Sequence, residues 1–315
     1  MSIVVYGLAD QRQDLVRCAR SAAAGRAVSV VSSRDELEAH VGAVQLVFTG
    51  TVDAPTVLEC LKDAQSRSRV VLVESRVETH TLRLALASAR VVGVMSAEDG
   101  SPPSWEVNYV TRRVVSPSEP TPWVSDVLPW GTTNISWTPK STADLRRIVT
   151  QIEGMARSLG CERREAMAVS TAAHELLMNA MYDAPVGPDG RPLYAHDRAN
   201  EITLGDHEVP RFRFTLGSDF LGLDASDPFG RLPRNRFFEG VLRGHMNMTG
   251  EGAPALDTSH GGAGLGLHTL YSSGTVLRAE LHPLKRTHVS WMLQRRGAAH
   301  RPTRSLFFAP ITVSE

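Results

Sequence analysis

The sequence predicts an α/β protein made of two parts, and two patterns carry this prediction. In residues 1–97, short valine-rich runs alternate with amphipathic stretches, which is typical of a buried parallel sheet with helices on both faces. In residues 132–297, long stretches with helical spacing precede runs that are typical of antiparallel strands. A proline-rich connection separates the two patterns, so we expect domains at 1–115 and 132–297, a linker at 116–131 and a tail at 298–315.

The composition excludes several classes of function. The 315 residues suffice for two ordinary domains, and 42% apolar with 22% charged residues is typical of a globular chain. The formal net charge is zero, so we expect no general attraction to nucleic acid or to an anionic membrane. No apolar run approaches the ~20 residues that a membrane helix needs. We therefore expect neither nucleic acid nor membrane as a partner.

The cysteines and the start of the chain indicate the compartment. Cys18, Cys60 and Cys161 are scattered without the spacing of metal ligands, and such a sparse, odd set fits a reducing environment. The chain starts with the strand-like Ile3-Val4-Val5-Tyr6, without the basic start and long apolar core of a signal peptide. We therefore expect a cytoplasmic protein.

In the first part, apolar runs predict strands and the stretches between them predict helices. The strands are expected at 3–6, 27–31, 44–48, 70–73 and 91–95, and the helices near 11–23, 34–41, 54–67 and 79–89. A last helix is expected at 105–115, where Val107, Val110 and Val114 recur along one side. This series of strand–helix units resembles the receiver domain of two-component signalling, a flavodoxin-like fold.

The residues that give receivers their chemistry are missing. Receivers keep an acidic cluster after the first strand and a phosphoacceptor Asp at the end of the third. Here the first strand leads into Gly7-Leu8-Ala9-Asp10, and the third ends at Phe48-Thr49-Gly50 with Asp53 as the nearest acid. Met95-Ser96 stands where receivers place a Lys. Because a single acid cannot form the usual metal site, we interpret this part as a pseudo-receiver that binds a protein and is not phosphorylated on Asp.

The second part is expected to begin with a strand at Ile135-Ser136-Trp137 and a helix cap at Ser141-Thr142. Apolar residues at helical spacing predict helices at 142–159 and 162–182. The arginine- and glycine-containing segment 231–260 is expected to be a long irregular lid. Four strands and a polar insert complete this part, the strands at 212–216, 220–224, 276–281 and 288–293, and the insert at 184–210.

Two apolar stretches lie outside the expected domains. The end of the linker, Trp123 to Trp130, is too apolar for a free tether, so we expect it to pack on one domain or on a partner chain. The tail turns apolar at Leu306-Phe307-Phe308, which could dock on its own domain or on a partner.

A first motif lies near the end of the helix at 162–182. Glu175 and Asn179 are four residues apart, so they share one face of the helix. A carboxylate and a carboxamide one turn apart can hold a water and Mg²⁺ together, since Mg²⁺ takes oxygen ligands and keeps waters beside substrate phosphates. Taken alone, the pair is better explained by a solvated Glu and a helix-surface Asn, because such pairs are common, so the motif needs support from elsewhere in the chain.

Two further motifs follow. Asp227 ends an alternating run before Pro228, where it could accept a hydrogen bond from a purine amino group, although a plain Asp-Pro turn is the alternative. Gly261-Gly262-Ala263-Gly264-Leu265-Gly266-Leu267 would let the backbone approach a polyphosphate closely, with a helix N-terminus behind it. This run is neither a P-loop nor the dinucleotide fingerprint, and glycine-rich runs are often flexible loops.

The order and spacing of the three motifs resemble the GHKL superfamily of ATP-binding domains, which includes histidine kinases, anti-sigma-factor kinases and gyrase-type ATPases. The resemblance covers residues 132–297 and implies an α/β sandwich of the Bergerat type that binds ATP and Mg²⁺. It implies that Asn179 holds Mg²⁺, that Glu175 is the catalytic residue acting on a water or hydroxyl, and that Asp227 reads adenine. The remaining cofactor-binding residues that it implies are Asp183, Gly230, Gly261, Gly262, Gly264, Leu265, Gly266 and Leu267.

Several positions depart from the family pattern. Phe229 and Arg231 occupy places where the adenine motif usually has glycine, and Tyr182 stands where many kinases have Lys. Asp219-Phe220-Leu221-Gly222 offers a competing Asp-x-x-Gly. No histidine lies between His80 and His174, so the dimerisation unit of histidine kinases is absent and autophosphorylation on histidine is disfavoured.

We therefore expect a signalling protein that binds Mg·ATP and regulates a protein partner according to its nucleotide state. An anti-sigma-type protein serine/threonine kinase and a hydrolysing ATPase switch are the alternatives, so the sequence leaves open whether the protein is an enzyme. A homodimer is one assembly that is compatible with this prediction.

Overall fold

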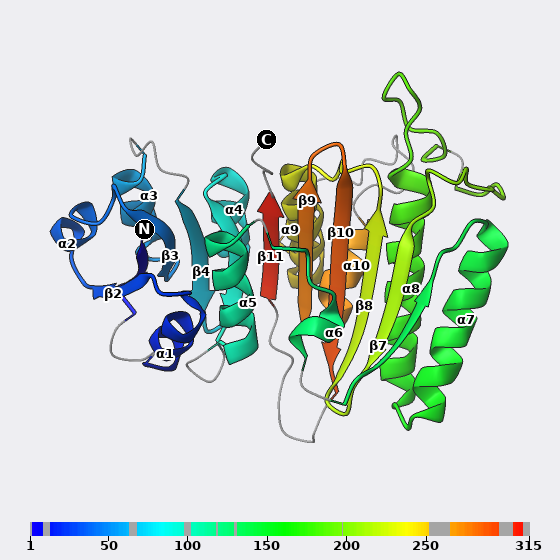
Figure 1. The fold of residues 1–315 in the computed structure, drawn as a ribbon, viewed down its shortest axis with the longest axis horizontal. Helices are drawn as coiled ribbons and strands as arrows, with labels where there is room; N and C mark the ends of the chain where they lie inside the picture. Colours follow the sequence, from blue (N-terminus) through cyan, green and yellow to red (C-terminus); the bar gives the residue numbers. More distant parts are fainter. Residues whose placement is uncertain are drawn as a thin grey trace. The chain divides into compact units, whose positions relative to one another are not determined.

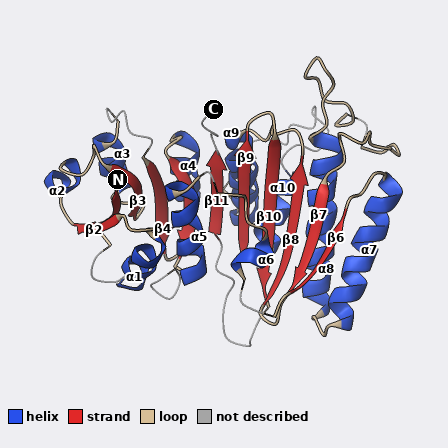
Figure 2. Cartoon of the chain, in the orientation of Figure 1, coloured by secondary structure: helices blue, strands red, loops and turns tan. Residues whose placement is uncertain are grey.

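The computed structural model describes residues 2–8, 13–62, 68–97, 102–117, 119–128, 131–196, 198–251, 265–295 and 305–310. The protein is of mixed α/β class (Figures 1 and 2). It divides into two compact units, which we call unit 1 (Met1–Pro120 with Thr303–Ala309) and unit 2 (Thr121–Pro302 with Pro310–Glu315). The division therefore falls inside the expected linker, and part of the expected tail belongs to unit 1.

Unit 1 contains a parallel sheet in the order β2-β1-β3-β4-β5. Because the inner strands are built from Val, Ile and Leu, they are buried on both faces, whereas β2 at the edge is partly exposed. The strands are β1 (Ser2–Tyr6), β2 (Ala27–Val31), β3 (Val44–Thr49), β4 (Arg69–Glu74) and β5 (Val91–Ser96). The helices are α1 (Gln13–Ala22), α2 (Arg34–Glu38), α3 (Ala54–Cys60), α4 (Thr79–Ala87) and α5 (Ser104–Val115).

The C-terminal strand β11 (Ser305–Pro310) joins the sheet of unit 1 and runs antiparallel to β5. Leu306 lies opposite Val94, and Phe307 lies opposite Gly93. The side chains of Leu306, Phe307 and Phe308 are buried. The apolar part of the tail is therefore a strand of the N-terminal unit.

Unit 2 contains an antiparallel sheet in the order β9-β10-β8-β7-β6. The strands are β6 (Thr133–Trp137), β7 (Arg211–Leu216), β8 (Phe220–Asp227), β9 (Val276–His282) and β10 (Arg286–Gln294). The helices are α6 (Val124–Val127), α7 (Thr142–Ser158), α8 (Arg163–Met178), α9 (Arg234–Thr249) and α10 (Leu265–Ser273). Helices α8 and α10 pack against one face of this sheet, and the short α6 packs against the other (Figure 1).

Local structure sets the start of α7 and the end of α8, the helix that carries the first motif. Helix α7 begins at Ser141, whose hydroxyl accepts a hydrogen bond from the Asp144 N–H while the Asp144 carboxylate caps the Ser141 N–H. Helix α8 runs directly into a π-helical turn, η1 (Asn179–Asp183), in which the Ala184 N–H donates to the Asn179 carbonyl at 2.9 Å. Such π turns are frequent at functional sites.

The expectation of a long irregular lid at 231–260 is wrong for the part that the structure describes. Residues 234–249 form helix α9, which buries Phe237, Phe238 and Val241 on one face. Gly244 lets α10 approach, because a Cβ there would clash with the His268 ring. Gly250 ends the helix in the left-handed conformation, with a φ of 74°. Residues 252–260 lie outside the described residues.

In the described ranges, no helix combines the length and the apolar character that a membrane span requires. Cys18, Cys60 and Cys161 are free thiols.

Candidate functional site

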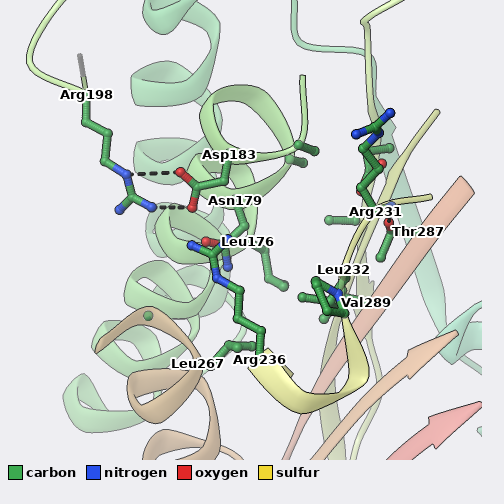
Figure 3. A pocket seen from close by; sticks show the side chains of 16 residues that line it. Leu176, Asn179, Asp183, Arg198, Arg231, Leu232, Arg236, Leu267, Thr287 and Val289 are labelled. Atoms are coloured by element: carbon green, nitrogen blue, oxygen red, sulfur yellow. Dashed lines mark hydrogen bonds and ion pairs between the residues drawn. The ribbon is translucent and has the colours of Figure 1, made fainter. Parts of the chain in front are cut away.

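The candidate site is a cavity in unit 2 with about 810 Å³ of empty space, including its open mouth. It lies between α8 with η1 on one side and strands β8 and β10 on the other (Figure 3). Its apolar walls come from Leu176, Ala180, Ala225, Leu232, Leu267 and Val289. Its polar groups come from Asn179, Asp183, Arg198, Asp227, Arg231, Arg236 and Thr287.

Residues of all three sequence motifs line or adjoin this cavity. Asn179 and Asp183 come from η1, Asp227 from the end of β8, and Gly266 and Leu267 from the first turn of α10. Motifs that are far apart in the chain meet because α8 and α10 pack side by side on the same face of the sheet.

Glu175 and Asn179 share the face of α8 and η1 that α10 approaches. A Cβ added to Gly266 would clash with the Glu175 carboxylate and would lie 3.8 Å from Asn179 Oδ1. Glycine at position 266 therefore leaves room for both oxygen-bearing side chains. Both are partly exposed, so they remain accessible to a ligand or to water.

Asp227 is a buried acceptor at the wall of the cavity, with an exposed fraction of 7%. Its Oδ1 accepts hydrogen bonds from the N–H groups of Phe229 at 2.9 Å and Gly230 at 3.4 Å. Burial raises the pKa of Asp227 to about 6, although these bonds and those from Thr287 act to lower it. At neutral pH the side chain is therefore an anionic acceptor that is already oriented by its own turn.

Gly230 lies outside the cavity lining. The backbone conformation next to the site nevertheless requires a glycine at this position. Its φ is +63°, and a Cβ would clash with the His282 carbonyl and lie 2.7 Å from the N atoms of Lys285 and Arg286. The turn after Asp227 thus packs tightly on the β9–β10 hairpin. In the structure Gly230 acts by positioning Asp227.

Asp183 lies at the cavity but is paired with an arginine. Arg198 Nε donates to Asp183 Oδ1 at 3.2 Å, and Arg198 Nη2 makes a second contact with Asp183 Oδ2 (Figure 3). This two-point contact holds the Arg198 guanidinium at the wall of the cavity. Sequence reasoning missed Arg198, because it lies in the polar insert and no local pattern distinguishes it. Arg191 and His196 of the same insert are exposed and outside the lining.

The charged groups at the cavity favour an anionic ligand. Arg198, Arg231 and Arg236 line it together with two aspartates. Figure 3 shows Arg198 and Arg236 on the side of Asn179, and Arg231 on the side of Thr287. Arg231 Nη1 donates to the Gly190 carbonyl at 3.3 Å, which leaves further donors of its guanidinium for a ligand.

Two departures from the family motif have a structural explanation. Tyr182 is buried, and its hydroxyl is bonded to Thr142 Oγ1 at 2.7 Å and donates to the Asn200 carbonyl at 2.9 Å. It therefore ties η1 to α7 and to the insert, and it is outside the cavity lining. Asp219 lies in the turn before β8 and is also outside the lining, so Asp227 is the aspartate at the cavity from this region.

A metal ion at this site would need further oxygen ligands from a bound phosphate compound. Asn179 offers one oxygen, and the described residues contain no group of three or more His, Cys, Asp or Glu side chains that could hold a metal. Mg²⁺ commonly takes one or two protein oxygens and completes its shell with waters and substrate phosphates. The donor set therefore fits Mg²⁺ bound together with a phosphate ligand.

Part of the glycine motif lies outside the described residues, namely Gly261, Gly262 and Gly264. Leu265 is the first residue of α10. In unit 1, Asp10 is also outside the described residues, and Asp53 approaches Gly7 so closely that a Cβ on that glycine would clash with its carboxylate.

No protein-family model matches this chain, and no curated protein sequence matches it. A solved structure, the SiaB-SiaC complex from Pseudomonas aeruginosa, is similar over 52% of this chain and 89% of its own chain. The sequence identity is 15% and the TM-score is 0.33, which is too low to support an argument about fold or function.

Proposed function

We propose that unit 2 binds ATP together with Mg²⁺ and that the protein regulates a protein partner according to its nucleotide state. The observation that carries this proposal is the meeting of Glu175 and Asn179, Asp227, and Gly266 around one cavity. Each residue alone has an ordinary structural explanation. Together they supply a hydrogen-bond acceptor for a purine base, an oxygen ligand for a cation, and a glycine whose backbone a phosphate can approach closely.

The side of the cavity that β8 and β10 form suits a purine base. Thr287 lies opposite Asp227 in the antiparallel register, and Val289 lies opposite Ala225. All four side chains line the cavity, because alternate residues of a strand point to the same face. A purine amino group can donate to the Asp227 carboxylate while the ring lies on Ala225 and Val289. A base without an amino group at that position would not form this additional hydrogen bond to the buried carboxylate, which disfavours it.

The side of the cavity that contains Asn179 suits a triphosphate. Asn179 supplies an oxygen to the cation, and Arg198 and Arg236 supply donors that match phosphate oxygens. When bound, Mg²⁺ neutralises phosphate charge. Glu175, next to Gly266, can accept a proton or a hydrogen bond from a water or hydroxyl at this position.

Both units support the wider fold assignment in this proposal. The parallel order β2-β1-β3-β4-β5 is that of flavodoxin-like folds, to which receivers belong. Thr49 is buried at the end of β3, where receivers carry their phosphoacceptor, so a pseudo-receiver role in protein binding suits unit 1. In unit 2, an antiparallel sheet with α8 and α10 on one face fits an α/β sandwich of the Bergerat type.

Residues 123–128 offer a route by which the nucleotide state could change surfaces away from the cavity. On the sheet face opposite the cavity, the Val124 N–H donates to Asp224 Oδ2 at 2.9 Å, three residues before Asp227 on the same strand. Although burial alone would raise it, the pKa of Asp224 is held below its usual range by His288 and Arg278. The Trp123 ring packs edge-on against His288 with centroids 5.0 Å apart. Hydrogen exchange at 123–128 should therefore respond to Mg·ATP, and exchange unchanged outside the cavity would contradict regulation through this segment.

Calorimetry with Mg·ATP tests the binding proposal. We expect Asp227→Asn to weaken Mg·ATP at least about tenfold, by loss of a charged hydrogen bond, and Asn179→Ala to remove the Mg²⁺ dependence. Asp219→Asn is the matched control, since Asp219 begins the competing Asp-x-x-Gly but lies outside the cavity lining. A folded wild-type protein that binds no Mg·ATP, or an Asp219→Asn change as large as Asp227→Asn, would contradict the proposal.

Incubation with labelled ATP separates binding from turnover. Tyr182 points into the core where many kinases have Lys, which favours a nucleotide-dependent regulator without turnover. The Glu175–Asn179 pair supports the two alternatives, an anti-sigma-type kinase and a hydrolysing ATPase. Label on a protein in cell extract would identify the first alternative, and free phosphate the second, provided that Glu175→Gln abolishes either product.

A further inference from the structure

A second pocket lies on the face of the unit 2 sheet opposite the candidate nucleotide cavity. We call it the outer pocket, and it is lined by Trp123, residues 136–138 and residues 211–213. It has about 650 Å³ of empty space, including its open mouth. Arg213 lies opposite Asp224 in the antiparallel register, which places it on the face away from the nucleotide cavity. Arg211 is two residues earlier on the same strand and therefore shares that face.

Arg213 is held in one orientation within the outer pocket. Its Nε donates to Ser136 Oγ and its Nη1 donates to Ser125 Oγ, both at 3.2 Å. The guanidinium lies over the Trp123 ring, with Cζ 4.1 Å from the ring centroid. A guanidinium carries more N–H donors than these bonds use, so further donors remain for a ligand. Because the side chain is already positioned, binding an anion costs less conformational entropy.

Arg211 adds a second positive charge to the outer pocket. Its side chain is exposed and has no hydrogen-bond or ion-pair partner among the described residues. Since Arg211 and Arg213 are two positions apart on one strand, their Cα atoms are about 7 Å apart. None of the described residues that line the outer pocket is acidic. Like charges at this separation repel, and an anion beside both arginines would relieve the repulsion.

Two acidic side chains close to the outer pocket are engaged by other groups. Asp224 is fully buried, and its carboxylate accepts hydrogen bonds from the Val124 N–H at 2.9 Å and the Ser290 hydroxyl at 2.5 Å. Asp126 caps the start of α6, where its Oδ2 accepts a hydrogen bond from the Trp123 N–H at 2.9 Å. Within the described part of the chain, neither carboxylate forms an ion pair with the two arginines. Their positive charge is therefore available to a ligand.

An open strand edge adjoins the outer pocket. Strand β6 is the last in the order β9-β10-β8-β7-β6, so β7 pairs with one side of it and no described strand pairs with the other (Figure 1). The residues of β6 are exposed or partly exposed. Such an edge presents backbone N–H and C=O groups that an extended segment can pair with. A small ion makes no use of this edge, whereas a protein segment paired with it places every second side chain on the face of the arginines.

We propose that the outer pocket binds an extended acidic segment of a partner protein. The segment pairs with the open edge of β6, and its carboxylates accept hydrogen bonds from the guanidinium groups of Arg211 and Arg213. A carboxylate matches the planar edge of a guanidinium in a two-point contact, which favours arginine over lysine at these positions. The outer pocket and the nucleotide cavity lie on opposite faces of the sheet, so the segment binds without nucleotide and this inference stands apart from ATP binding.

Fluorescence anisotropy with the full-length protein, in the absence of nucleotide, tests this proposal. The probe is a short labelled peptide in which glutamate alternates with valine, and the same peptide with glutamine in place of glutamate should bind at least about tenfold more weakly. Arg211→Glu should weaken the glutamate peptide at least about tenfold, because it replaces attraction by repulsion. Arg164→Glu is the matched control, since Arg164 is exposed on α8 and the change in charge is the same. This control should bind like the wild type.

Two further measurements locate the bound segment. Arg213→Lys keeps the charge and loses the two-point contact, so it should also weaken the peptide. Hydrogen exchange should show new protection at 133–137, because the edge N–H groups of β6 become bonded.

Several results would overturn the proposal. These are no binding of the glutamate peptide by the folded wild type, equal binding of the glutamine peptide, an equal loss in Arg164→Glu, unchanged binding by Arg213→Lys, and protection that leaves 133–137 unchanged. Displacement of the peptide by an equal concentration of inorganic phosphate would assign the outer pocket to a small anion and overturn its assignment to a protein segment.

Discussion

Replacing Glu106 by Gln should make unit 1 more stable at alkaline pH. Glu106 is buried in α5, and burial raises the pKa of its carboxyl to about 8, an effect that the interaction with Ser305 only partly opposes. The carboxyl is therefore neutral in the folded protein at pH 7 and ionised in the unfolded chain. Gln keeps the shape of the neutral acid and cannot ionise.

The size of the effect follows from the two pKa values. The ordinary value is 4.5 and the folded value is about 8. Because the folded state binds the proton more tightly, the free energy of unfolding is highest below pH 4.5 and falls as the pH rises through this interval. A difference of about 3.5 pKa units corresponds to about 5 kcal/mol, at about 1.4 kcal/mol per unit. Above pH 8 the wild type has lost this contribution, whereas Glu106→Gln has not.

Hydrogen exchange of β5 and α5 peptides, measured in increasing urea at pH 5 to 9, reports the stability of unit 1 separately from unit 2. We expect the wild type to lose stability across this range and Glu106→Gln to lose much less. Glu59→Gln is the matched control, since Glu59 is exposed on α3 and its removal should change the stability by less than about 0.5 kcal/mol. Equal pH slopes for the wild type and Glu106→Gln would refute the reasoning.

Three further predictions concern the cavity. Since burial raises the pKa of Asp227 to about 6, Mg·ATP affinity should fall about tenfold per pH unit below pH 6, measured by calorimetry, and Asp227→Asn should show no such slope. Gly266→Ala would crowd Glu175 and should weaken Mg·ATP by at least about tenfold while thermal melting shows a folded protein; unchanged affinity would place the phosphates elsewhere. Arg198→Ala should weaken ATP about tenfold or more but adenosine little, whereas Arg191→Ala, outside the cavity, should change neither, and equal losses for ATP and adenosine would contradict a phosphate contact.

Much of the secondary structure follows from local patterns in the sequence. The valine-rich runs of unit 1 are strands close to the expected bounds, because a strand buried on both faces needs apolar residues throughout. The start of α7 at Ser141 follows from a cap that involves residues three positions apart. The common face of Glu175 and Asn179 also follows from helix geometry, and both side chains do lie near Gly266.

The prediction failed where distant residues determine the local conformation. The segment expected as an irregular lid forms α9, which buries Phe237 and Phe238 and approaches His268 of α10 closely at Gly244. A glycine in a helix interior is unfavourable by propensity, so the local sequence points the wrong way. The tertiary contact outweighs that preference.

The site contains residues that no local pattern could identify. Thr287 faces Asp227 through the register of two strands, and Arg198 reaches the cavity through its ion pair with Asp183. The β11 strand joins β5 across most of the length of the chain. Periodicity and capping report on residues a few positions apart, whereas strand register and ion pairs between loops depend on how the whole chain packs. For this reason the motifs could be read in the sequence, but the partners that orient them and the strand that completes unit 1 could be seen only after folding.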